Sequence, residues 1–214
     1  MSKYLPYLFV VMTWGLASCV TILQSLITPT TIVTDNRLKG IWNDGNSRTM
    51  QVQQVVDSKL MQELKGSDIG AARIAYYSKH YMINYKENNL SYLWFGGLIQ
   101  IQGQYYINLI PEECLNTKGT EEYTKKGYDH WATSSIAKME WKDNNTIVLH
   151  FLNGDYIKEI ILNGKAHIKY EYDPLFDSFV ITASSEELQD FLAKYGNKDI
   201  LYKGGNTLVL SRKI

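Results

Sequence analysis

The sequence predicts a mainly β domain, folded as an antiparallel β-barrel or a strongly curved sheet with one or two short helices. Short segments of alternating apolar and polar residues recur from residue 49 to residue 213, and turn-forming residues separate them. The chain also has 16 tyrosines and 5 tryptophans, and aromatic residues suit β-sheet surfaces. The best helix signals are confined to residues 185–195. Many short strands with one late helix favour a barrel or a curved sheet.

The expected strands follow from these alternations. In the first segment, Met50, Val52 and Val56 share one face. In the clearest hairpin, Met139 and Trp141 point inward while their neighbours point outward. Gly103 marks another turn between strands. Strands or hairpins are predicted over residues 49–56, 80–95, 98–111, 135–151, 167–184 and 206–213.

Few segments have helix signals. Ser184 and Glu187 form a capping box at the start of the helix near 185–195, and Gly196 suits its end. A shorter helix is predicted to begin at Asp57. Residues 154–165 are interpreted as a short helix rather than a strand, and the polar residues 116–130 as a loop or a helical turn.

Residues 1–18 have the layout of a lipoprotein signal peptide, with Lys3 before an apolar stretch of about 12 residues. Leu16, Ala17, Ser18 and Cys19 resemble the lipobox of bacterial lipoproteins. In that family the cysteine thiol receives a diacylglyceryl group and the peptide bond before it is cut. The resemblance implies lipidation of Cys19, a tether over residues 19–34 and a single β-barrel-like domain over 35–214.

The alternative is an uncleaved membrane anchor from Leu5 to about Val33. Gln24, Pro29 and several threonines disfavour it, because polar groups in hydrocarbon need partners. No acidic residue follows Cys19 closely, and such residues often accompany surface export in Bacteroidota-type lipoproteins. We therefore expect a lipid anchor on the periplasmic side of a bacterial membrane rather than at the cell surface.

A second resemblance concerns the fold. The segment "RLKGIW", with Gly40 and Trp42, resembles the glycine-x-tryptophan opening of lipocalin-like barrels, in which the tryptophan plugs the closed end. The second half of the chain is similar to a set of uncharacterised bacterial lipoproteins of Bacteroidota type. This resemblance implies a lipocalin-like barrel in the cell envelope and carries no activity.

The charge balance and motifs exclude several classes of function. Lysine plus arginine and aspartate plus glutamate both total 22, so no net field attracts nucleic acid. The four histidines, His80, His130, His150 and His167, lack partners at the spacing of metal ligands. No metal and no cofactor are therefore predicted.

No catalytic residue is predicted either. Cys114 follows two glutamates, which would raise its pKa, so we interpret it as a packing or loop residue. Glu171, Asp173 and Asp177 flank a hairpin turn, and turn chemistry accounts for them without a catalytic cleft.

Aromatic residues are the best candidates for a binding site. Tyr81, Tyr92, Trp94 and Tyr105 are enough to line a ligand cavity in a barrel. The interpretation that we favour for them is a role in the core and in cross-strand pairs, and the ligand cavity is the alternative. The leading hypothesis is a non-enzymatic, lipid-anchored envelope protein that binds an apolar or amphipathic small molecule. A hydrolase acting on envelope glycans or lipids and a structural subunit of an envelope complex are the alternatives. No particular protein partner is indicated.

Overall fold

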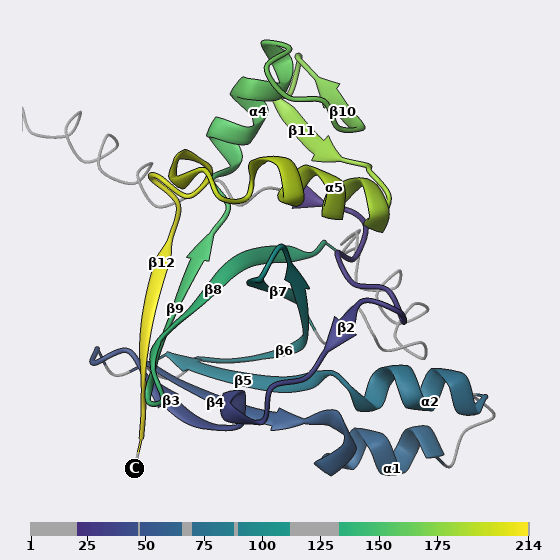
Figure 1. Ribbon diagram of the computed structural model, residues 1–214, viewed down its shortest axis with the longest axis vertical. Coiled ribbons are helices and arrows are strands. Elements are labelled where there is room, and N and C mark those ends of the chain that lie inside the picture. The colour runs from purple at the N-terminus through teal and green to yellow at the C-terminus, as the bar shows by residue number, and fades with distance from the viewer. Residues whose placement is uncertain (1–20, 47, 66–69, 88–89, 112–132, 214) are drawn as a thin grey trace, which may run out of the picture.

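A computed structural model describes residues 21–46, 48–65, 70–87, 90–111 and 133–213. Eight antiparallel strands close into a barrel in the order β6-β5-β4-β3-β12-β9-β8-β7, and β7 pairs back onto β6 (Figure 1). This confirms the predicted fold class, a mainly β, lipocalin-like barrel. The strands are β3 (Gly40–Asn43), β4 (Arg48–Gln54), β5 (Tyr81–Glu87), β6 (Leu90–Ile101), β7 (Gln104–Pro111), β8 (Ser135–Asp143), β9 (Thr146–Phe151) and β12 (Thr207–Arg212).

Tight turns join the paired strands where the sequence predicts them. Gln102 and Gly103, both with positive φ, form the two-residue turn between β6 and β7. One predicted position is wrong: Val56 is 44% exposed, and Val55 is buried instead. The 3-10 turn η3 (Val55–Asp57) ends β4 and breaks the alternation that had placed Val56 with Met50 and Val52.

The barrel has two different ends. At the end that we call closed, the 3-10 turn η2 (Asn36–Leu38) precedes β3, and the short β6–β7 and β8–β9 turns lie there. The other end, which we call open, has the β3–β4 and β5–β6 connections. The long insertion of residues 152–206 between β9 and β12 also leaves from this end.

The barrel interior is a packed core. Its central side chains are no more than 5% exposed, which leaves little surface among them for a ligand to contact. Ile83 occupies the space in front of Gly96, where a Cβ would lie 2.6 Å from Ile83 Cδ1. The buried interior residues are Leu38, Trp42, Met50, Val52, Tyr81, Ile83, Leu98, Ile107, Ala137, Met139, Ile147, Leu149 and Leu210.

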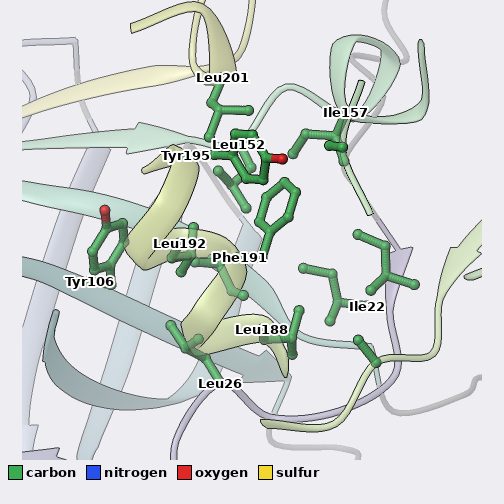
Figure 2. Packing of buried hydrophobic residues seen from close by; sticks show 14 of the residues in the cluster. Ile22, Leu26, Tyr106, Leu152, Ile157, Leu188, Phe191, Leu192, Tyr195 and Leu201 are labelled. Carbon is green, nitrogen blue, oxygen red and sulfur yellow. The ribbon is translucent and has the colours of Figure 1, made fainter. Parts of the chain in front are cut away.

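The insertion forms a second layer over the outer wall of the barrel (Figure 1). It contains α4 (Gly154–Leu162), β10 (Tyr170–Asp173), β11 (Ser178–Ile181), α5 (Ser185–Tyr195) and η5 (Asp199–Leu201). Figure 2 shows Leu188, Phe191 and Leu192 of α5 gathered with Ile22 and Leu26 of the N-terminal segment. The predicted capping box of Ser184 and Glu187 is present.

The hairpin predicted over 167–184 forms as β10 and β11, but it lies outside the barrel. It belongs to a separate three-stranded sheet with β1 (Thr21–Ile22), in the order β1-β11-β10. Alternation indicates a strand and does not indicate which sheet the strand joins.

Residues 21–34, expected to be a tether, are part of the folded domain. β1 pairs with β11, and β2 (Ile32–Val33) pairs with β6. Leu26 is fully buried, and its N–H donates to the buried Asn108 Oδ1 at 2.8 Å. The expected boundary at residue 35 is therefore too late, because the apolar residues of this segment are core residues.

The described residues contain four α-helices, and three of them lie in segments that the sequence analysis interpreted as helical. α1 (Lys59–Lys65), α4 and α5 match predicted helices, whereas α2 (Ala71–Ser78) does not. The residue before α2 is Gly70, which has no side chain to cap the helix, and no residue of α2 is buried. The sequence therefore has neither a capping residue nor a buried apolar face to indicate this helix. Residues 116–130, predicted as a loop or helical turn, lie outside the described residues.

Candidate functional site

The four aromatic residues predicted to line a ligand cavity lie at different places in the barrel. Tyr81 is buried at the closed end, with Tyr105 near it. Trp94 lies on β6 and is half-buried against the interior core. Tyr92, also on β6, is exposed, and its ring centroid lies 6.4 Å from that of Tyr85. They are therefore spread along the barrel from the closed end toward the open end, and neither of the two hollows described below is lined by them.

Tyr81 has a structural role at the closed end. Its hydroxyl accepts a hydrogen bond from Asp35 N–H at 2.7 Å and donates to Asp35 O at 3.1 Å. Burial raises the pKa of Tyr81 to about 12. Burial alone would raise the pKa of Asp35, but hydrogen bonds from Arg37 outweigh it and lower that pKa. Tyr81 and Asp35 thus hold the segment before β3 in a fixed place.

Trp42 lies at this same end, as its sequence position predicts. It is fully buried, its Nε1–H donates to Leu38 O at 2.9 Å, and its ring centroid lies 6.0 Å from that of Trp141. The Arg212 guanidinium carbon lies 4.4 Å from the Trp42 ring centroid, and Arg212 also donates to the Lys39 carbonyl at 2.8 Å. The closed end is therefore sealed by an aromatic residue with a cation stacked on it.

The outer wall of β8 and β9 has a hollow that we call the lysine groove, with a volume of about 620 Å³. Because Ala137, Met139 and Trp141 point into the barrel, the residues between and after them point outward along β8. Residues that follow α5 form the facing side of the groove. It is lined by Lys138, Glu140, Lys142, His150, Asp199, Ile200, Tyr202 and Lys203.

Glu140 organises the charges of the lysine groove. Its carboxylate lies 3.1 Å from Lys138 Nζ, 3.0 Å from Lys142 Nζ and 3.8 Å from His150 Nε2. Hydrogen bonding to Lys142, more than to Lys138, lowers the pKa of Glu140, so it is an anion at neutral pH. One carboxylate is thus shared by two ammonium groups, and Lys203 adds a third cation to the lining.

Tyr202 is the aromatic residue in the lining of the groove. Burial raises the pKa of Tyr202, and its hydroxyl donates to the Gly196 carbonyl at 2.8 Å, so it stays neutral. Lys138 Nζ lies 5.6 Å from the Tyr202 ring centroid. Ile200, another residue of the groove lining, is 42% exposed. The groove therefore offers ammonium groups next to an aromatic ring and an aliphatic side chain.

A second hollow of about 430 Å³ lies between α5 and the segment before β10. It includes His167, whereas His150 lines the lysine groove, so folding does not bring these two histidines together. His80 is buried elsewhere, stacked on Phe95 with ring centroids 4.4 Å apart. Among the described residues, no three metal-ligating side chains gather into a site. His130 and Cys114 lie outside the described residues.

The acidic set near residue 175 has the turn role that the sequence favours. Asp173 Oδ1 accepts from Leu175 N–H at 2.8 Å, which fixes the β10–β11 turn. Asp177 accepts from the Tyr172 hydroxyl at 2.9 Å and is ion-paired with Lys158. Glu171 pairs with Val180 across the hairpin. These carboxylates are explained by local structure.

The lysine groove was missed from sequence because its two sides are far apart along the chain. The alternation of β8 places Lys138, Glu140 and Lys142 outward, and that part was predictable. The facing residues, Asp199 to Lys203, reach the groove only through the topology of the insertion. No pattern in the sequence links the two.

The lipobox, Leu16 to Cys19, lies outside the described residues. In the part of the chain that the structure describes, no helix is both long and apolar enough to cross a membrane. Comparisons with protein-family models, with curated proteins and with solved structures found no match for this chain.

Proposed function

We propose that this protein is a bacterial lipoprotein, held at the periplasmic side of a membrane by acyl chains on Cys19. The support is the signal-peptide layout of residues 1–18 and the lipobox that ends it. The fold is compatible with this processing, because β1, the first strand described, begins at Thr21, after the proposed cut. Cutting the bond between Ser18 and Cys19 would leave every described residue on the mature chain. Two or three acyl chains give firm attachment, whereas one does not.

Metabolic labelling with fatty acid tests the anchor. The wild-type protein is expected to take up label and to have a mature chain that begins at Cys19. Cys19→Ser removes the thiol that the transferase modifies, so label should be lost, and Cys114→Ser is the matched control that keeps it. Label that persists in the Cys19→Ser protein would contradict the proposal.

For the folded domain, we propose non-enzymatic binding of a small anionic amphiphile in the lysine groove. The observation that carries this proposal is the gathering of three lysines, two of them paired with Glu140, against the two carboxylates of Glu140 and Asp199 in a lining that also contains Tyr202 and Ile200. Ammonium groups attract a carboxylate or phosphate headgroup, and the ring and aliphatic side chain contact its apolar part. A volume of about 620 Å³ is in the range of small-molecule sites. The packed barrel interior makes the outer groove the better candidate.

Binding can be tested with two probes of equal chain length, a medium-chain fatty acid and an alkyl glucoside. Titration calorimetry should detect the acid and give a weaker signal for the neutral glucoside. Lys138→Gln together with Lys203→Gln should weaken binding of the acid about tenfold or more, because each charge-assisted contact is worth about 1.5–3 kcal/mol. Lys59→Gln, on α1, is the control and should bind like wild type. If both probes bound equally well, the proposal that the lysines attract an anionic headgroup would be wrong.

Two alternatives stay open and predict different results. A hydrolase would turn over a glycan or ester panel. The natural acid–base pair to test is Glu140 and His150, 3.8 Å apart, and Glu140→Gln would abolish that turnover. A structural subunit would co-purify with another envelope protein after gentle extraction and retain no small molecule in native mass spectrometry.

A further inference from the structure

The tip of the β10–β11 hairpin displays two adjacent apolar side chains to solvent. Leu175 is 82% exposed and Phe176 is 78% exposed. Among the described residues, the next most exposed large apolar side chain is Val209, at 50%. Single exposed apolar residues are ordinary, but two neighbours projecting from one tip form a local surface that gains free energy when it leaves water.

The tip is held in a defined conformation. Asp173 Oδ1 accepts hydrogen bonds from Leu175 N–H at 2.8 Å and from Phe176 N–H at 3.4 Å. Asp177, the last turn residue, is bound by the Tyr172 hydroxyl and by Lys158 of α4. The turn that bears the two apolar side chains is therefore already fixed by hydrogen bonds. A contact made by these side chains would cost little further conformational entropy.

The start of the described chain points toward this tip. β1 runs parallel to β11, with Thr21 opposite Val180 and Ile22 opposite Ile181. Because the strands are parallel, the N-terminal end of β1 at Thr21 faces the same way as the start of β11 at Ser178, next to the turn. Two residue steps, at most about 7 Å of chain, connect Cys19 to Thr21. The hairpin and its sheet lie at the end of the molecule opposite α1 and α2 (Figure 1).

We propose that Leu175 and Phe176 insert into the membrane surface beside the acyl chains of Cys19, so that the domain docks in one orientation. This inference rests on the proposed lipidation of Cys19. The acyl chains supply the attachment, and the hairpin tip supplies a second contact that restricts rotation about the short link.

The charges around the tip specify the kind of membrane contact. Glu171 and Asp173 are exposed acids, and Asp177 is already paired with Lys158. This side of the molecule therefore offers no excess of cations to anionic headgroups. The contact is apolar, and Tyr170, which is 38% exposed, adds an aromatic ring suited to the headgroup level. Anionic lipid is therefore not expected to strengthen docking, and the two exposed acids should weaken it somewhat at low salt.

The test uses the lipidated protein in phosphatidylethanolamine–phosphatidylglycerol vesicles. With Cys114→Ser in the background, Leu175→Cys provides the one free thiol for an environment-sensitive dye, because the lipidated Cys19 is blocked. The dye emission should shift to the blue and be quenched by lipids brominated in their acyl chains. Val209→Cys, in β12 of the barrel, is the matched control and should show neither effect. Both variants change exposed side chains, so circular dichroism should match wild type.

The outcomes separate the two proposals. If the protein floats with the vesicles and has acyl chains, but the dye at residue 175 behaves like that at residue 209, the docking inference is wrong and the lipid anchor stands. If the protein has no acyl chains and does not float, the anchor is wrong and the inference falls with it. A dye that is shielded equally when a protein partner is bound in detergent, without vesicles, would show that the tip is a protein-binding site instead.

Discussion

Replacing Trp42 tests whether the closed end of the barrel depends on its buried indole. Truncating a fully buried tryptophan to alanine costs about 3–5 kcal/mol. Trp42→Ala also leaves the Leu38 carbonyl without its donor, which costs about 1–3 kcal/mol in a buried site. It removes the ring under Arg212 as well, a contact worth about 0.5–2 kcal/mol. These losses overlap, so we expect Trp42→Ala to lower the free energy of unfolding by about 5 kcal/mol.

Urea unfolding of the chain beginning at residue 20, followed by far-ultraviolet circular dichroism, measures this loss without relying on tryptophan emission. Trp42→Phe is the matched variant, because it keeps an aromatic ring and loses the hydrogen bond to Leu38, and it should cost about 1–2 kcal/mol. A loss below about 1 kcal/mol for Trp42→Ala would refute the sealing role of Trp42. Equal losses for the two variants would assign the effect to the hydrogen bond rather than to packing.

Three further changes test other parts of the fold. Burial lowers the pKa of His80 from 6.5 to about 4. The unfolded chain therefore binds the proton more readily, and the free energy of unfolding should fall by about 3 kcal/mol as pH drops from 6.5 to 4. His80→Gln should flatten this slope, and equal slopes would contradict the assignment. Asn108→Ala should lower the free energy of unfolding by about 1–3 kcal/mol and speed hydrogen exchange at the Leu26 amide, which loses its acceptor. Unchanged exchange at Leu26 would contradict the role of this hydrogen bond. Gly196→Ala should cost about 1–3 kcal/mol, because the added methyl meets Tyr106, and an unchanged melting temperature would contradict this contact.

The barrel strands were predictable because each follows a simple physical rule. Period-two alternation separates inward from outward residues, and it assigns Met139 and Trp141 to the interior and Lys138 and Glu140 to the outside. Short turns with glycine or asparagine then force neighbouring strands to pair. Gly103, with φ of +80°, occupies a turn position that disfavours a side chain.

Other features depend on contacts distant in sequence and could not be read from local patterns. The apolar residues between Val20 and Thr34 have no regular period, so they read as a tether. Their burial depends on α5 and on Asn108, more than 80 residues away. The same limit applies to the lysine groove, whose facing sides come from β8 and η5.

The N-terminal segment couples the proposed anchor to the insertion rather than to the barrel interior. Ile22, three residues after Cys19, is buried in the core that α5 covers, and Leu23 N–H donates to Ile181 O at 3.1 Å. Gln189 of α5 donates to the Leu26 carbonyl at 2.9 Å. If Cys19 is acylated as proposed, a link this short would leave the domain few orientations at a membrane. Under the proposed lipidation, the layer that packs over the barrel wall would therefore determine which face of the molecule meets lipid.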